Sequence, residues 1–216
     1  MAFDIFELLE SEHRLVAKVL TVAHSCIPNM AQPGVAVQPV STELIGFCGQ
    51  FVSRYHQPRE FELFRCLQRK GCASITAPMR DLLAEHGRLA RLTGMMEAAC
   101  WLNAADQPGT STRVAGYLSD YIALTQEHML KEDRFILTAS SLVDSFDQAA
   151  LAVAFEKFEQ ELPGTALCAH HAKWAQQWAC GDTLPVRRAD GSRIACLAPA
   201  APPWSCATAH SVAEPL

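Results

Sequence analysis

The sequence lacks several features that would assign it to common classes of protein. No apolar run approaches the ~18 residues of a membrane-spanning helix, and the N-terminal segment carries acidic residues where a secretory signal needs a basic start. Charged residues make up only 19% of the chain and its formal net charge is −5, which disfavours attraction to nucleic acids or anionic lipids. We therefore expect a cytoplasmic protein that binds neither nucleic acid nor a membrane.

The nine cysteines include no Cys-x-x-Cys pair and no short metal-binding spacing. In a reducing cytosol we expect most of them to be reduced thiols. We interpret Cys48, Cys66 and Cys100 as small apolar residues on helices, because free cysteine is among the most buried residue types. The cysteines therefore predict neither a disulfide framework nor a thiolate metal site.

Half of the 216 residues are apolar, which is enough for one domain with an appendage. Apolar spacings of three and four, with helix caps and Pro or Gly turns between them, predict six helices and require no strand. Their ranges are about 3–27, 41–70, 78–104, 111–139, 145–162 and 165–179. The predicted fold class is all-α, with an up-down-up-down four-helix bundle over 3–140 and two further C-terminal helices over 145–180.

These helices form one predicted domain over residues 1–181. The remaining residues, 182–216, are rich in Pro and Ala and carry no usable periodicity. Such a composition cannot bury enough apolar surface to fold by itself. We interpret this segment as a largely disordered tail.

Two His-x-x-x-Glu pairs stand out, His56 with Glu60 and His128 with Glu132. In a helix this spacing places both side chains on one face, a turn apart, so that such a pair can hold one metal centre. A single pair is weak evidence, because His and Glu four residues apart also occur on solvated faces. The repetition of the pair makes it informative.

One further helical histidine precedes each pair in similar sequence, Ser-Glu-His at His13 and Ala-Glu-His at His86. The offset between the two copies is 73 for these histidines, and it is 72 for both members of the pairs. The chain thus contains two copies of one helical hairpin. A solvated face would have no reason to keep this period.

The spacing of these residues also predicts where they meet. Midpoints between successive histidines of the set fall at 34.5, 71 and 107, each inside a predicted turn. Because every helical residue rises ~1.5 Å, all four histidines should lie at one level of an antiparallel bundle. Two carboxylates buried there need protons or cations, and nitrogen and oxygen ligands without thiolates suit iron or manganese. The alternative is a buried network of hydrogen-bonded histidines without metal.

This ordered set of residues resembles the hemerythrin-like (HHE cation-binding domain) family, in particular its bacterial cytoplasmic branch, over about residues 3–160. The resemblance implies a bundle of hemerythrin type around two non-haem irons that share an oxo or hydroxo bridge. It also implies that Glu60 and Glu132 bridge the irons, that His13 and His56 bind one iron, and that His86 and His128 bind the other.

The sequence departs from oxygen-carrying hemerythrins at the third helix. Those proteins have a second histidine one turn from the third-helix ligand, whereas the flanking residues here are Leu82 and Ala90. One iron therefore lacks a protein ligand. Water, an exogenous molecule or a further histidine, with His170 and His171 as candidates, must take that position.

Helical rotation assigns roles to several neighbours of these residues. Tyr121 lies two turns before His128 and is predicted to line the pocket for the bound ligand, with ordinary core packing as the alternative. Pro58 should bend the second helix, because it cannot donate a hydrogen bond to the carbonyl of Arg54. Three glutamates that directly precede a histidine are expected to be solvated: Glu12, Glu85 and Glu127.

Three classes of function remain open. The favoured one is binding of nitric oxide or dioxygen at the open iron position, in defence against or sensing of nitrosative or oxidative stress. The second is an enzyme that decomposes hydrogen peroxide or nitric oxide and receives electrons from a donor protein. The third is an iron-binding module whose metal only stabilises the fold. Neither the oligomeric state nor the choice between binding and turnover follows from the sequence.

Overall fold

The computed structural model describes residues 4–30, 35–36, 38–103, 109–179 and 187–188, and nearly all of them are helical. The elements in chain order are α1 (Ile5–Met30), β1 (Val35–Ala36), α2 (Gln38–Gly46), the π-helix η1 (Phe47–His56), α3 (Gln57–Arg69), α4 (Ala73–Asn103), α5 (Thr110–Ser140), α6 (Ser145–Glu161), α7 (Gly164–Ala179) and β2 (Arg187–Arg188). The all-α class is confirmed. One small exception is the antiparallel pairing of the two-residue strands β1 and β2.

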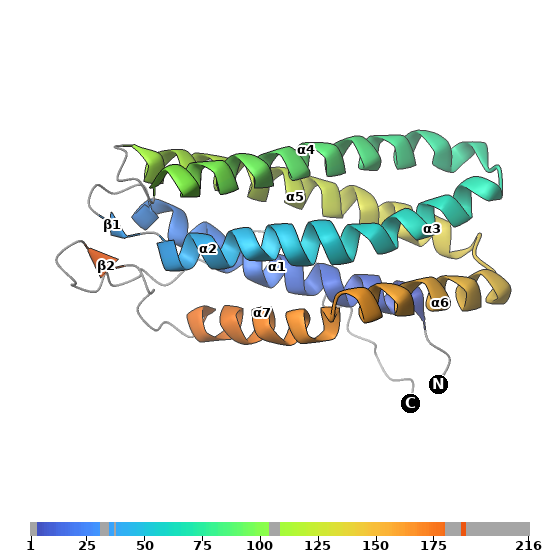
Figure 1. Ribbon diagram of the computed structural model, residues 1–216. Coiled ribbons are helices and arrows are strands. Elements are labelled where there is room, and N and C mark those ends of the chain that lie inside the picture. The colour runs from blue at the N-terminus through green and yellow to red at the C-terminus, as the bar shows by residue number, and fades with distance from the viewer. Residues whose placement is uncertain (1–3, 31–34, 37, 104–108, 180–186, 189–216) are drawn as a thin grey trace, which may run out of the picture.

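Four long helical segments lie side by side along one direction (Figure 1): α1, the continuous run α2–η1–α3, α4 and α5. Each segment runs opposite to the one before it, and α6 and α7 follow one another along the side of the molecule where α1 lies. Contacts between elements include α4 with α5, α1 with α5, α1 with α7, and α3 with α6. None of the described helices combines the length and the apolar character needed to cross a membrane.

Local signals in the sequence set several of the helix ends. The Asp4 carboxylate accepts a backbone hydrogen bond at 2.9 Å and caps α1, as its position predicts. Gly71 and Gly109 adopt positive φ angles of 67° and 82° in the turns before α4 and α5. A reciprocal capping box between Asp144 and Asp147 opens α6, one residue earlier than the cap that the sequence suggests. The predicted tail lies outside the described residues, apart from β2.

The second segment differs from the single bent α-helix that the sequence predicts. The chain is π-helical up to His56, and the N–H of Gln57 bonds to the carbonyl of Val52, five residues back. Pro58 then occupies the first turn of α3, where its missing N–H costs least. The π register thus ends at His56, a predicted ligand, and the α-helix that contains Pro58 in its first turn continues the segment without a break.

Helix α4 begins at Ala73, five residues before the predicted start at Pro78, which lies inside the helix. Ile75 and Met79 are both buried in the core on this early part of α4. Apolar packing of this turn outweighs the one backbone hydrogen bond that the proline removes. Tertiary packing thus moved this helix end away from the position that local sequence favours.

The apolar core consists of two separate clusters, and every long segment passes through both. On α1, for example, Leu9 belongs to one cluster and Leu15 to the other. Helix α5 runs the other way, so that Leu124 lies in the same cluster as Leu15 and Phe135 lies in the same cluster as Leu9. Between the clusters lies a polar layer, defined here by the six predicted site residues His13, His56, Glu60, His86, His128 and Glu132.

Candidate metal centre

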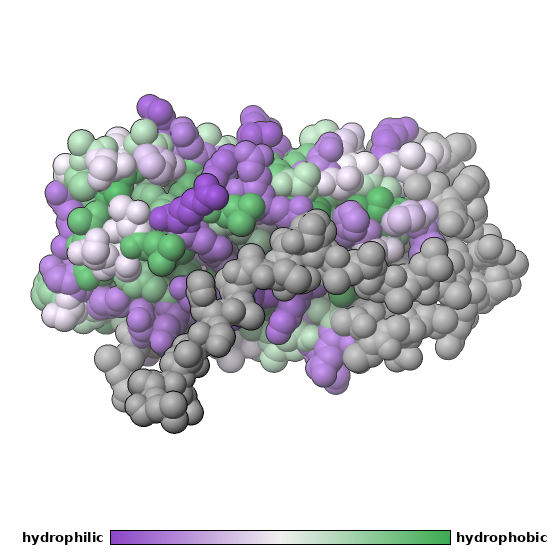
Figure 2. All heavy atoms as spheres, turned by 180° about the vertical axis from the view of Figure 1, so that it is seen from behind, coloured by the Kyte–Doolittle hydropathy of each residue, from purple (hydrophilic) through white to green (hydrophobic). Residues whose placement is uncertain are grey.

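The structure brings all six residues of the polar layer together in the interior. Each is buried, with at most 5% of its surface exposed. They come from α1, η1, α3, α4 and α5, so that the site draws on all four long segments. On the face turned away in Figure 1, polar and apolar side chains are interspersed over the described surface (Figure 2).

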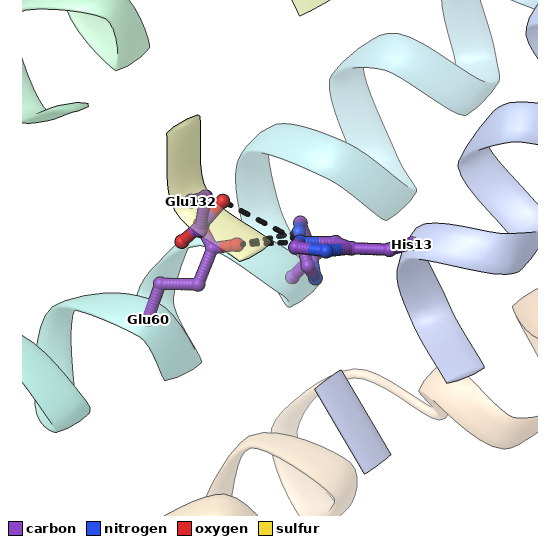
Figure 3. Close-up of side chains that lie close together, drawn as sticks. His13, Glu60 and Glu132 are labelled. Carbon is purple, nitrogen blue, oxygen red and sulfur yellow. Dashed lines mark hydrogen bonds and ion pairs between the residues drawn. The ribbon is translucent and has the colours of Figure 1, made fainter. Parts of the chain in front are cut away.

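One half of the layer pairs His13 and His56 with the two carboxylates. His56 Nε2 lies 2.6 Å from Glu60 Oε1. His13 Nε2 lies 3.4 Å from the same oxygen and 3.4 Å from Glu132 Oε2. Figure 3 shows His13 facing both glutamates, which approach from α3 and α5. The nitrogen and oxygen atoms of this half therefore converge on one point.

The other half pairs His86 and His128 with the same two carboxylates. His86 Nε2 lies 3.2 Å from Glu60 Oε2, which is the oxygen turned away from His56. His128 Nε2 lies 3.2 Å from Glu132 Oε2, and the two Nε2 atoms are 3.0 Å apart. Each carboxylate thus contacts a histidine of both halves.

This arrangement forms two groups of four residues that share both glutamates. Within each group the ligand atoms lie within 4.8 Å of one another, so that each group could hold a metal ion. Three buried carboxylate oxygens, Glu60 Oε2 and both oxygens of Glu132, receive no hydrogen bond of normal geometry within the described structure. Because an uncompensated buried carboxylate is costly, these atoms fit a bound cation.

The electrostatics of the layer favour added positive charge. Burial lowers the pKa of His56, but the carboxylates of Glu60 and Glu12 outweigh it and raise this pKa to about 9. The same balance, between burial and nearby carboxylates, raises the pKa of His13 and of His128. Burial raises the pKa of Glu60, but the surrounding histidines lower it well below its usual value. Without metal, protons on the imidazoles provide the positive charge.

Three of the four histidines are also oriented through their second nitrogen. Nδ1 of His56 donates to Glu12 at 2.8 Å, and Nδ1 of His128 donates to Glu85 at 3.0 Å. Nδ1 of His13 donates to Asp133 at 2.9 Å. Hydrogen bonds of this kind fix the ring and raise the basicity of a metal-binding histidine.

The expectation that Glu12 and Glu85 are solvated was therefore wrong: both are buried, with 2% and 7% exposure. Each glutamate lies one residue before a histidine of the layer, and a rotation of about 100° around the helix directs its side chain toward a neighbouring helix rather than toward water. Glu127 faces outward as predicted and pairs with Lys131 at 2.8 Å.

A cation supports each of these two glutamates. Arg59 donates to Glu12, and Lys131 donates to Glu85 at 2.5 Å. The Arg59 guanidinium also lies 3.8 Å from the centroid of the Tyr55 ring. The signal that would have identified Arg59 and Lys131 is their place directly before the glutamates of the two His-x-x-x-Glu pairs.

The fourth histidine, His86, has no hydrogen bond at its second nitrogen from any residue that the structure describes. Nδ1 of His86 is buried and has no hydrogen-bond partner among the residues that the structure describes. Its ring instead contacts Phe61 edge to face, at 5.4 Å between centroids, and stacks on Phe64 at 6.2 Å. Apolar packing therefore holds this ring where hydrogen bonds hold the other three.

Comparisons with protein-family models, curated proteins and solved structures find no match to this chain. The interpretation of the polar layer accordingly depends on its own geometry and chemistry.

The remaining candidate residues lie outside the two groups. His170 and His171, considered as a further ligand, instead contact Glu43 on α2, at 2.6 and 3.1 Å. With Glu43 they form a separate group on α2 and α7 that could hold a metal ion of its own. The idea that they complete the predicted site is therefore not supported by their position.

Tyr121 lies in the larger apolar cluster and is fully buried beside the Cys48 thiol. Burial raises the pKa of the Tyr121 hydroxyl well above its ordinary value, and it raises the pKa of Cys48 to about 12. The Tyr121 hydroxyl makes no hydrogen bond of normal geometry within the described structure. A role in lining a ligand pocket stays a prediction.

The cysteine interpretation holds for Cys48 and Cys66, which are buried, while Cys100 is half-buried. None of the six cysteines that the structure describes is in a disulfide. Of the two residues that flank His86 by one turn, Leu82 is buried and Ala90 is exposed. The flank that faces the interior is therefore Leu82.

Proposed function

We propose that this chain is a hemerythrin-like protein whose polar layer holds two iron ions and binds nitric oxide or dioxygen at an open coordination position. The observation that carries the proposal is the sharing of Glu60 and Glu132 between two histidine pairs. Two carboxylates that each face both pairs suit two neighbouring ions better than one. The antiparallel order of the four long segments in Figure 1 supports a hemerythrin-type bundle.

The donor set supports iron. Each group offers two imidazoles and two carboxylates and no thiolate, which suits iron or manganese better than a structural zinc. Four donors also leave coordination positions free on an ion that accepts six, and open positions are what ligand-binding metal centres keep. Reduced iron in such a site supplies reversible binding of small diatomic molecules.

The chain's own residues would hold, orient and shield this centre. Glu60 presents one oxygen to each histidine pair, as a bridging carboxylate requires. Glu12 and Glu85 orient one histidine of each pair by hydrogen bonds. The apolar clusters above and below the layer exclude water, so that a small uncharged ligand enters more easily than an ion. These properties support the proposed capture of nitric oxide or dioxygen, in stress defence or sensing.

The proposal is tested by metal analysis and gas titration. Protein expressed with ample iron should contain two irons per chain, and the anaerobically reduced form should bind nitric oxide or dioxygen saturably. A separate peroxide titration distinguishes binding from catalysis, because an enzyme would decompose many equivalents. One zinc without iron, or two irons that bind neither gas, would overturn the proposal in favour of a metal-stabilised module.

A further inference from the structure

The two halves of the polar layer are built by the same internal repeat, and the repeat extends beyond the proposed ligands. Arg59, Glu12 and His56 form a chain of contacts in which the cation supports the carboxylate and the carboxylate holds the histidine. Lys131, Glu85 and His128 form the equivalent chain in the second half. The equivalent residues are 72 or 73 positions apart, which is the period of the ligands themselves.

The repeat fails at one pair of positions, and this pair lies against the two remaining histidines. Asp133 follows Glu132 and holds Nδ1 of His13 at 2.9 Å. The residue 72 positions earlier is Phe61, which follows Glu60 and packs its ring against His86. A phenyl ring cannot accept the hydrogen bond that the aspartate accepts. Among the Nδ1 atoms of the four histidines, that of His86 is consequently the one without a hydrogen bond to the described residues.

We infer that Phe61 makes the two metal positions unequal, so that the His86/His128 position binds its ion more weakly and exchanges it faster than the His13/His56 position. This inference rests on the proposed function. Loss of a carboxylate partner from a metal-bound histidine typically lowers metal affinity about 10–100-fold. Both histidines of the first position have such a partner, whereas in the second position, among the described residues, only His128 has one.

This asymmetry assigns different roles to the two ions. An ion between His13 and His56 is held by two oriented rings and is the permanent member of the pair. An ion between His86 and His128 would have one ring whose Nδ1 side contacts aromatic rings in place of a carboxylate, so that this ring is held less firmly toward the ion. Phe61 is thus a positioning residue that acts on the second ion through the His86 ring.

The test is the release of iron from the anaerobic, fully loaded full-length chain into an excess of a chromophoric ferrous chelator. A Glu43→Gln background keeps the separate group on α2 and α7 from contributing. The parent chain should release its two irons in two phases of one equivalent each, with rates at least about 10-fold apart. Phe61→Asp should slow the fast phase, because an aspartate there can accept the hydrogen bond from His86.

Two further variants serve as controls. Phe61→Leu removes the ring without supplying an acceptor, so that its fast phase should remain fast. Asp133→Leu should accelerate the slow phase and make both positions alike. Phe61 is 39% exposed and the Asp133 side chain is 55% exposed. Substitutions at these two partly exposed positions are therefore compatible with folding. If Phe61→Asp nevertheless fails to load, the Asp133→Leu result decides.

The outcomes separate this inference from the proposed function. A chain that binds fewer than two irons contradicts the proposed function. Two irons that are bound but released in a single phase contradict the asymmetry alone. Equal release kinetics in Phe61→Asp and Phe61→Leu would likewise overturn the role of Phe61, since only one of these side chains can accept a hydrogen bond.

Discussion

Replacing Glu132 by glutamine tests whether the shared carboxylates hold metal. Glu132 is completely buried, and both of its oxygens lack a hydrogen bond of normal geometry in the described structure. Its side chain contacts His13 of one group and His128 of the other, at 3.4 and 3.2 Å. The amide keeps the shape of the side chain but loses its charge, so that Glu132→Gln should weaken both metal positions at once.

The magnitude follows from linkage. A ligand at 100 times its dissociation constant stabilises the folded state by about 2.7 kcal/mol, so that two ions contribute about 5 kcal/mol. At 2–4 °C per kcal/mol for a chain of this size, metal loading should raise the melting temperature by roughly 10–20 °C. Glu132→Gln should lose most of this rise, whereas His86→Gln, which alters one group, should lose about half.

The assay compares metal content and thermal unfolding with and without a chelator. Glu127→Gln is the matched control, since Glu127 lies on the same helix but faces solvent. The unfolding temperature of each metal-free protein is the baseline from which its own metal-induced rise is measured. A Glu132→Gln protein that keeps two metal ions and the full metal-induced rise would refute the reasoning.

Three further predictions follow from the site and its surroundings. Leu82 lies one turn before the α4 ligand and faces inward, so that Leu82→His should place an imidazole at the open position. The variant should keep two irons but bind nitric oxide more weakly, on the order of ten-fold or ~1.4 kcal/mol, as measured by anaerobic titration. An unchanged affinity would contradict the assignment of the open position. Gly164→Ala should destabilise the fold by about 1–3 kcal/mol in urea unfolding, because an added Cβ would lie 1.8 Å from the Tyr55 ring, whereas Gly87→Ala, with open space around it, should not. Finally, the pKa of His56 in the folded, metal-free protein, about 9, lies above its ordinary value of 6.5. Protonation of His56 therefore contributes roughly 3 kcal/mol to the free energy of unfolding, and this contribution is fully present below pH 6.5 and lost as the pH rises toward 9. Chelator-treated protein should lose thermal stability over that interval while loaded protein changes less, and a rise in stability of the metal-free form would contradict the prediction.

Sequence periodicity was sufficient to predict that the six site residues meet, because the repeat constrains both the level of each side chain along the bundle and the face of the helix from which it projects. An i, i+4 spacing fixes the face of a helix, and equal distances from a turn fix the level. Glu60 and Glu132 could be placed on the same layer as the histidines by these two rules alone. The helix ends could be predicted in the same way where a capping residue or a glycine marks them, as at Asp4 and Gly109.

The rest depended on contacts between helices, which no single-helix rule contains. Taken alone, each helix turns Glu12 and Glu85 away from the bundle axis and toward solvent, whereas in the fold a neighbouring segment covers that side. The π register before Gln57 directly precedes Pro58 within a packed segment, and no single-helix rule predicts it. The start of α4 moved to Ala73 because core packing outweighed a local signal. The repeat did carry a usable clue, since Glu12 and Glu85 share the period of the ligands.

The two apolar clusters explain how a buried polar layer can exist before any metal arrives. Each long segment is fixed by packing on both sides of the layer, so that the backbone positions of the histidines and glutamates do not depend on an ion. Hydrogen bonds from Glu12, Glu85 and Asp133 then fix three of the rings, which reduces the ordering that metal binding would otherwise require. Burial of charge in this layer destabilises the metal-free fold, while apolar packing above and below offsets it. Such packing keeps the backbone of the layer in place whether or not an ion is bound, which is what the proposed exchangeable metal position requires.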